Sequence, residues 1–302
     1  MKLPVVHNQK FESLVTYTKQ AQDNFGASAA SVLVIQDNKI VTEWYAGHHH
    51  FKNGAVQVTS DSMFNLYSTR KTYVGLATAI AAVEARISID TKVTDIESEL
   101  SEQDFVGLTL RDLATKSNLK YYGESRIERE EVACKVIKRL TGHTIAELIH
   151  RRILTPLNLT HSQWATVPSA NLVCDFQAGN GYASVRIESD EGHERNLYTS
   201  ARDLAMWGNL FLNKGMLNGV ELIPSQVFDV IDQLRQDTED KSRILGWYHK
   251  KHWYYATGAA GCHCVVVPER NAVAVRMLNR YTDKYAEDQV IFNEMLFDCL
   301  NS

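Results

Sequence analysis

The chain has 302 residues, of which 44% are hydrophobic and 23% charged, with 16 glycines and only 5 prolines. This composition excludes collagen-like and wholly disordered proteins, and the length is enough for a substantial core in one or two lobes. Its 32 basic and 36 acidic side chains give a net charge of −4, so no overall positive field would attract a nucleic acid, and we expect none as a partner.

The first predicted elements are a surface helix and a hairpin. Apolar residues recur on one helical face over 11–24. Two β-rich runs, 31–35 and 39–45, flank the turn formers Asp37 and Asn38, which is typical of a β-hairpin. The alanine-rich segment 68–86 is apolar on most sides, which predicts a central, buried helix.

The middle of the chain is predicted to be helical, and strands return near the end. Helices are predicted at 110–115, 128–140, 144–154, 201–212 and after Ser225. The later segments predict strands at 252–257, 262–267 and 272–278, followed by a closing helix at 286–300. Because strands lie at both ends of the sequence, we expect an α+β fold, with an antiparallel sheet flanked by helices and an inserted all-helical lobe.

Two Ser-x-x-Lys arrangements occur, Ser68 with Lys71 and Ser117 with Lys120. A lysine one helical turn after a serine can take the hydroxyl proton if its amine is desolvated. Ser117 begins a polar stretch, whereas Ser68 stands at the start of the most apolar predicted helix, whose first-turn amides could stabilise an oxyanion. This context favours Ser68 and Lys71 as nucleophile and base, and a serine N-cap with a solvated lysine is the alternative.

Further segments stand in a fixed order around this motif. They are Met63–Lys71, Leu108–Leu113, Ile153–Thr160, Leu197–Leu210, and Ala256–Gly258 followed by Val265–Glu269. Together they resemble the serine β-lactamase and penicillin-binding-protein-like family, especially its class C and esterase branch. The resemblance implies a β-lactamase-like fold with a single catalytic domain over 1–302, in which a mainly helical lobe of about 63–199 is inserted into an α/β lobe of about 1–62 and 200–302.

The resemblance also implies roles for individual residues. Ser68 would attack a carbonyl to form an acyl-enzyme, and Lys71 would accept and later return the proton. The oxyanion would lie between the backbone amides of Ser68 and Ala259, because Ala259 follows Thr257 and Gly258 on the strand that the family places beside its nucleophile.

The sequence departs from the family pattern in two places. Ala256 stands where relatives usually carry the lysine or histidine that holds a substrate carboxylate, which argues against β-lactams as good substrates. The Tyr-x-Asn element of the proton relay is also missing. Tyr122 or Tyr121 could supply the hydroxyl, with Ser125 a lesser option, or these tyrosines could simply pack at a loop edge.

We therefore expect a serine hydrolase that cleaves small, uncharged esters or amides and is poor on β-lactams. The alternatives are an inactive ligand-binding homologue and an amidase or peptidase acting on short peptides or D-amino-acid compounds. We expect no cofactor and no metal site. Cys262 and Cys264 would point to one side of a strand and His263 to the other, as core residues do. The sequence does not define the oligomeric state.

We expect a cytoplasmic protein without a membrane partner. The five cysteines are odd in number and too sparse for a disulfide framework. The N-terminal residues become polar at Asn8, too early for the apolar core of a signal peptide. The longest nearly uncharged run, 73–83, is far shorter than the roughly 20 residues that span a bilayer.

Overall fold

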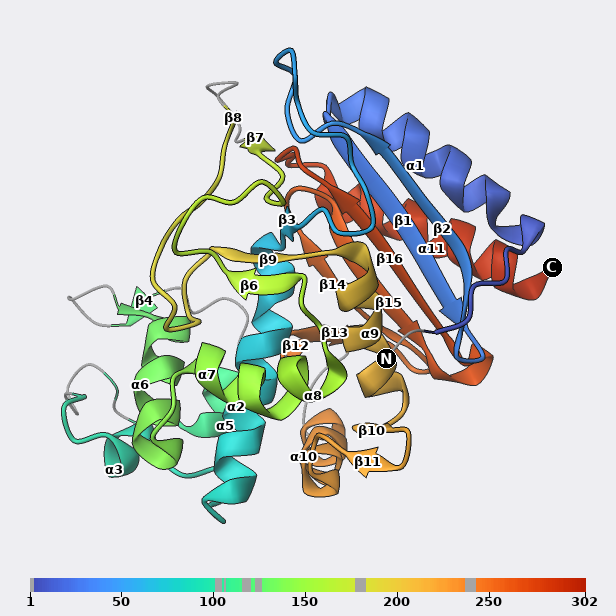
Figure 1. The fold of residues 1–302 in the computed structure, drawn as a ribbon. Coiled ribbons are helices and arrows are strands. Elements are labelled where there is room, and N and C mark those ends of the chain that lie inside the picture. Colours follow the sequence, from blue (N-terminus) through green and yellow to red (C-terminus); the bar gives the residue numbers. More distant parts are fainter. Residues whose placement is uncertain are drawn as a thin grey trace.

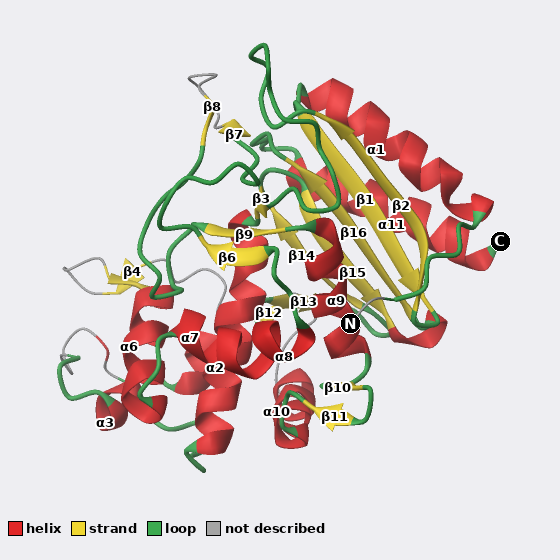
Figure 2. Cartoon of the chain, in the orientation of Figure 1, coloured by secondary structure: helices red, strands yellow, loops and turns green. Residues whose placement is uncertain are grey.

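The computed structural model describes residues 3–100, 105, 107–115, 121–122, 127–176, 183–236 and 243–302, and of residues 121, 122, 127 and 183 the backbone alone. A twisted antiparallel sheet forms one side of the molecule (Figure 1). Helices α1 (Glu12–Phe25) and α11 (Tyr285–Asn301) cover its outer face, and the remaining helices lie on the other side (Figure 2). The expected α+β class, with an antiparallel sheet flanked by helices, is confirmed.

The main sheet combines strands from both ends of the chain. In order it consists of β12 (Arg243–Ile244), β13 (Trp247–His249), β14 (Tyr254–Gly258), β15 (Cys262–Val267), β16 (Ala272–Leu278), β1 (Ala29–Gln36) and β2 (Lys39–Gly47). Strand β1 pairs with β16 in a register that places Ala30 opposite Leu278. The hairpin turn between β1 and β2 has Asp37 at φ 51° and Asn38 at φ 57°, as a type I′ turn requires.

The helices on the inner side belong mostly to the middle of the chain. They are α2 (Lys71–Glu84), α3 (Val93–Ile96), α5 (Leu110–Thr115), α6 (Arg129–Thr141), α7 (Ile145–Ile149), α8 (Thr155–Leu157), α9 (Ala201–Leu212) and α10 (Ser225–Gln236), with a π-helical turn at His150–Leu154. A smaller sheet contains β3 (Phe64–Asn65), β9 (Leu197–Thr199) and β6 (Ser162–Trp164). Short hairpins are formed by β4 (Tyr121–Tyr122) with β5 (Ile127–Glu128), β7 (Asp175–Phe176) with β8 (Ala183–Ser184), and β10 (Met216–Leu217) with β11 (Val220–Glu221).

Helix α2 is the buried centre of the inner layer, as the sequence predicts. Its residues from Thr72 to Ala82 are all buried. Tyr73 stacks on Trp207 of α9 with ring centroids 3.7 Å apart, and the indole nitrogen of Trp207 donates to Thr72 Oγ1 at 3.0 Å. The helix begins at Lys71 rather than at Ser68, because Tyr67 has φ 49° and residues 67–70 form a separate 3₁₀ turn.

The two faces of β15 bury different neighbours. Cys262 and Cys264 join the core between the sheet and the inner helices, whereas Val265 packs against the outer layer with Phe292 of α11. His263 points away from the two cysteines and lies 2.8 Å from Asp288 of α11. All five cysteines are free thiols. Within the described ranges, no helix has both the length and the apolar character needed to cross a bilayer.

Candidate active site

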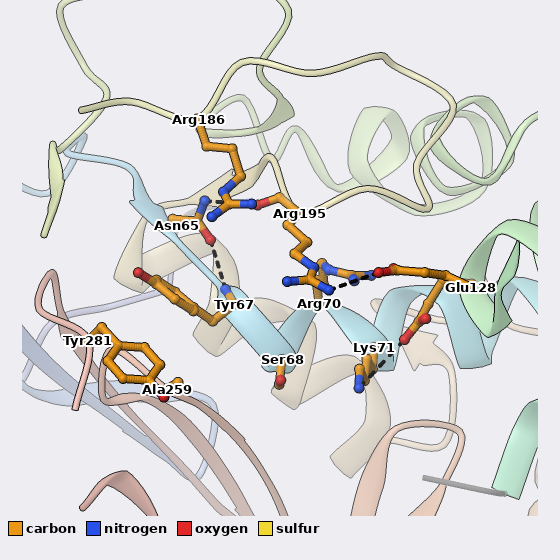
Figure 3. Close-up of a pocket in the computed structure, with 11 residues that line it drawn as sticks. Asn65, Tyr67, Ser68, Arg70, Lys71, Glu128, Arg186, Arg195, Ala259 and Tyr281 are labelled. Atoms are coloured by element: carbon orange, nitrogen blue, oxygen red, sulfur yellow. Dashed lines mark hydrogen bonds and ion pairs between the residues drawn. The ribbon is translucent and has the colours of Figure 1, made fainter. Parts of the chain in front are cut away.

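A cavity of about 410 Å³ opens where η2 (Tyr67–Arg70) meets β14 and the N-terminal end of α6. Its lining combines Ser68, Lys71 and Ala259 from the expected site with further residues, shown in Figure 3: Asn65, Tyr67, Arg70, Glu128, Glu130, Arg186, Arg195 and Tyr281. Three of the sequence-predicted site residues therefore share one cavity.

Ser68 is presented by a strained and firmly anchored turn. Tyr67, the residue before it, has φ 49°, a conformation that costs a non-glycine residue about 1 kcal/mol or more. Its backbone amide donates to Asn65 Oδ1 at 2.9 Å, and its hydroxyl donates to Asp175 Oδ1 at 2.5 Å. On the other side of Ser68, Thr69 Oγ1 donates to the carbonyl of Cys262 at 2.8 Å. These hydrogen bonds hold the turn that carries Ser68 at the N-terminal end of α2.

Strand β14 runs unusually close to this turn. A Cβ atom at Gly258 would lie 2.4 Å from the carbonyl oxygen of Leu66 and 3.0 Å from Tyr67 Cβ, so only glycine fits there. This close approach brings the following residue, Ala259, into the cavity lining. Gly258 and Thr257 do not line the cavity themselves. Thr257 Oγ1 lies 2.9 Å from His263 Nδ1, behind the strand.

Lys71 lies in a largely buried environment that contains a carboxylate. Its Nζ is 3.6 Å from Glu130 Oε1 in the first turn of α6. Burial lowers the pKa of Lys71 from 10.5 to about 8, although Glu130 acts in the opposite direction. Burial raises the pKa of Glu130, but Arg70, Arg129 and Lys71 outweigh this effect and lower it to about 2. Glu130 is therefore ionised and stabilises the protonated form of Lys71.

Arg70 contributes a buried positive charge beside the nucleophile. The residue is only 4% exposed, yet it lines the cavity, and its Nη1 atom has no hydrogen-bond partner among the described residues. Burial lowers the pKa of its guanidinium, and the nearby Glu130 raises it. A guanidinium remains protonated in proteins even when its pKa is lowered, so this charge is permanent.

Two further arginines reach the cavity from the segment between β8 and β9. Arg195 Nη2 lies 2.9 Å from Glu128 Oε1, and its backbone carbonyl accepts a hydrogen bond from Asn65 Nδ2 at 2.9 Å. Arg186 Nη1 lies 3.5 Å from Glu188 Oε1. In Figure 3, both arginines and Arg70 lie on one side of Ser68, away from Ala259 and Tyr281.

The candidate relay tyrosines are placed through their backbone only. Tyr121 and Tyr122 form β4, which pairs with β5 so that Tyr121 stands opposite Glu128. Because Glu128 lines the cavity, β4 lies one strand away from the site. The side chains of both tyrosines fall outside the described residues, as do Ser117, Lys120 and Ser125.

The structure adds residues that the sequence analysis did not identify, above all Glu130 and Arg70. The sequence contains a pattern that could have identified each of these two residues. Glu130 shares a helical face with Ala133 and Ile137, which are buried, so a carboxylate on that face requires a buried partner. Arg70 interrupts the most apolar segment of the chain just before its helix begins. Arg186 and Arg195 come from an irregular segment without a comparable pattern.

Comparisons with known proteins confirm the expected β-lactamase-like fold. The family model described as Beta-lactamase matches residues 14–122 and 130–292. An uncharacterized protein of Alkalihalophilus pseudofirmus is 27% identical over 341 residues, with all of both chains covered. Solved structures with similar folds include a penicillin-binding protein homologue from Caulobacter crescentus, with TM-score 0.76, 15% identity, 99% of this chain and 100% of that chain covered. The hydrolase EstCE1, described as having promiscuous acyltransferase activity, has TM-score 0.73 and 11% identity, with 96% and 99% covered.

Proposed function

Because the chain belongs to the Beta-lactamase family, we propose that it is a serine hydrolase that cleaves small esters through an acyl-enzyme on Ser68. The observation that carries this proposal is the shared cavity of Ser68, Lys71 and Ala259. Ser68 and Lys71 come from one local motif and Ala259 from a distant strand end, and together they would supply the nucleophile, the base and a backbone amide for the oxyanion.

The proposed reaction has two halves. In the first, neutral Lys71 takes the proton of Ser68 while Oγ attacks the ester carbonyl, and the oxyanion lies between the amides of Ser68 and Ala259. The carbon–oxygen bond to the alcohol then breaks, and Lys71 returns its proton to the departing oxygen. In the second half, Lys71 removes a proton from water as the water oxygen attacks the acyl carbon. The bond between that carbon and Ser68 Oγ then breaks, Lys71 returns the proton to Oγ, and the acid is released.

The electrostatics around Lys71 support its role as a base that is available in part at neutral pH. With a pKa of about 8, about a tenth of the lysine is neutral at pH 7. Glu130 keeps the remainder protonated. A base whose pKa lies near the working pH is close to the optimum for proton transfer.

Two features support the preference for esters over β-lactams: the residue at position 256 on strand β14, and the altered tyrosine in the proton relay. Ala256 is fully buried in the main core, so this position provides no cation for the carboxylate of a β-lactam. Esters also need less protonation of the leaving group than amides do, and they tolerate an altered tyrosine relay better. The similarity to the hydrolase EstCE1 is compatible with this choice.

The five free thiols are compatible with the cytoplasmic location that we propose.

Turnover of a p-nitrophenyl ester series tests the proposal. We expect Ser68→Ala to lower kcat at least about 10³-fold and Lys71→Ala to lower it by a similar order, since nucleophile and base act as a unit. Ser60→Ala and the exposed Lys92→Ala, both outside the cavity lining, serve as matched controls and should retain the wild-type rate. Nitrocefin should be a poorer substrate than the best ester. Ester turnover that survives Ser68→Ala would contradict the proposal, and absence of turnover in the wild type would favour a ligand-binding homologue.

A further inference from the structure

The cavity next to Ser68 carries more positive than negative charge. Among the residues that the structure describes, four cations line it, namely Arg70, Lys71, Arg186 and Arg195, against the two carboxylates Glu128 and Glu130. Two charged neighbours form ion pairs with these groups: Arg129 with Glu130, and Glu188 with Arg186. They contribute one charge of each sign, so the described residues keep an excess of two positive charges. The whole chain, in contrast, has a net charge of −4. The cationic character is therefore local to the cavity.

The carboxylates in this cavity are already engaged by other partners. Glu130 lies 3.6 Å from Lys71 and 3.4 Å from Arg129, and Glu128 lies 2.9 Å from Arg195. Within the part of the chain that the structure describes, Arg70 Nη1 is buried without a hydrogen-bond partner, and the residue is almost wholly withdrawn from water. A buried charged donor without an acceptor is costly, and such groups normally pair with an anion.

The arrangement of the arginines indicates which kind of anion would fit. Arg70, Arg186 and Arg195 lie on the same side of Ser68 in Figure 3 and come from two separate segments. Arg70 and Arg195 are close enough for Arg195 to disfavour the charged form of Arg70. Arg186 lines the same cavity. A carboxylate bound beside these guanidinium groups would be stabilised by their positive charge, and their planar forks match its two oxygens.

We propose that Arg70, Arg186 and Arg195 bind a carboxylate of the substrate, so that the preferred esters carry a second, anionic group. This inference rests on the proposed function, because it assigns the substrate class of the same site. The carboxylate would lie on the helical side of the cavity and not beside Ala256. It also differs from the uncharged substrate expected from the near-neutral chain, since net charge averages over the whole surface and says little about one cavity.

Two esters with the same leaving group distinguish binding of the substrate carboxylate from cleavage of the ester bond. Mono-p-nitrophenyl glutarate carries a free carboxylate, and p-nitrophenyl butyrate does not. We expect wild-type kcat/KM to be at least about tenfold higher for the glutarate ester, mainly through a lower KM, because a charge-assisted hydrogen bond has about that effect. Arg186→Gln and Arg195→Gln should each reduce this preference severalfold or more. Arg270→Gln removes one charge in the turn between β15 and β16, outside the cavity lining, and should retain the preference.

A binding measurement makes the inference independent of turnover. Calorimetric titration of the Ser68→Ala protein with glutarate should show binding that weakens at least about tenfold in the Ser68→Ala/Arg186→Gln protein. Such binding without Ser68-dependent ester turnover would support the carboxylate site and refute only the proposed hydrolase. Conversely, turnover of both esters at equal kcat/KM in the wild type, or a preference that both arginine variants leave intact, would overturn the carboxylate site and leave the hydrolase standing.

Discussion

Lys71 Nζ lies 3.6 Å from Glu130 Oε1, and the two side chains are only 16% and 7% exposed. In this pair a lysine of lowered pKa faces an ionised carboxylate beside the nucleophile. Glu130 stabilises the protonated form of Lys71, whereas burial of Lys71 destabilises that form. The balance between burial and Glu130 therefore sets the pH at which Lys71 becomes a base.

The first prediction concerns pH. Wild-type kcat/KM for a neutral ester should rise with pH, with a midpoint near pH 8, and level off at higher pH, because only neutral Lys71 accepts the serine proton. Removing the charge of Glu130 destabilises the ammonium, so Glu130→Gln should move the midpoint down by about one pH unit or more. Glu131→Gln, on the same helix and 38% exposed, is the control. A midpoint that stays in place or moves up in Glu130→Gln would contradict this account.

The second prediction concerns the proton relay. If Tyr122 completes it, Tyr122→Phe should lower kcat/KM about 10²-fold or more, whereas Tyr121→Phe should have a smaller effect. Each substitution removes only the tyrosine hydroxyl, so the change in steady-state kcat/KM measures the contribution of that hydroxyl. Thermal unfolding of each variant checks that the fold is retained. The reverse order of effects would assign the relay to Tyr121, and wild-type rates in both variants would exclude both tyrosines.

Much of the fold could be predicted because its elements have strong local signals. Asp37 and Asn38 define the hairpin turn, Gly26 and Gly142 end helices in left-handed conformations, and β15 and β16 match their predicted bounds. The two- and three-residue strands such as β3 were not predicted, since pairings of that length depend on neighbours distant in the sequence.

The candidate site was predicted only where a motif places its residues. Ser68 and Lys71 belong to a local motif, whereas Ala259 is expected only from the family resemblance, which places the strand with Thr257 and Gly258 beside the nucleophile. Glu130 is separated from Lys71 by 59 positions in the numbering, and only tertiary packing of α6 against α2 brings them together. The 3₁₀ turn at Ser68 likewise depends on Tyr67 and its bond to Asp175, which no local pattern indicates.

The third prediction tests the close approach of β14. Gly258→Ala should destabilise the protein by about 1–3 kcal/mol and lower ester turnover, because the new methyl group collides with the backbone at Leu66 and displaces Ala259. Urea unfolding and ester kinetics measure the two effects. Gly54→Ala is the control: its Cβ meets no atom within 4 Å, so it should cost only backbone strain at φ +79° and leave turnover unchanged. Wild-type turnover in Gly258→Ala would contradict the positioning role.

The fourth prediction concerns the buried residues behind β14. His263 lies 2.9 Å from Thr257 Oγ1 and 2.8 Å from Asp288 Oδ2. Burial, reinforced by Arg276, lowers the pKa of His263 from 6.5 to about 4. Between these values the unfolded chain binds the proton and the folded chain does not. Stability should therefore fall as the pH falls through this window, by up to about 1.4 kcal/mol per pH unit for this group.

Urea unfolding between pH 7 and pH 4 measures that slope in the wild type and in His263→Gln. The variant should retain only the smaller slope contributed by other buried groups such as His249, whose pKa burial lowers to about 3. A slope in His263→Gln equal to that of the wild type would show that His263 does not titrate in this way.

Peptide mapping by mass spectrometry after incubation with a fluorophosphonate, which reacts preferentially with activated serines, tests most directly whether Ser68 is the nucleophile. We expect one stoichiometric adduct on Ser68, formed faster as the pH rises toward 8 and absent from Lys71→Ala over the same time. A protein that stays unlabelled, or that carries its adduct on another serine, would contradict the assignment of Ser68 as the nucleophile.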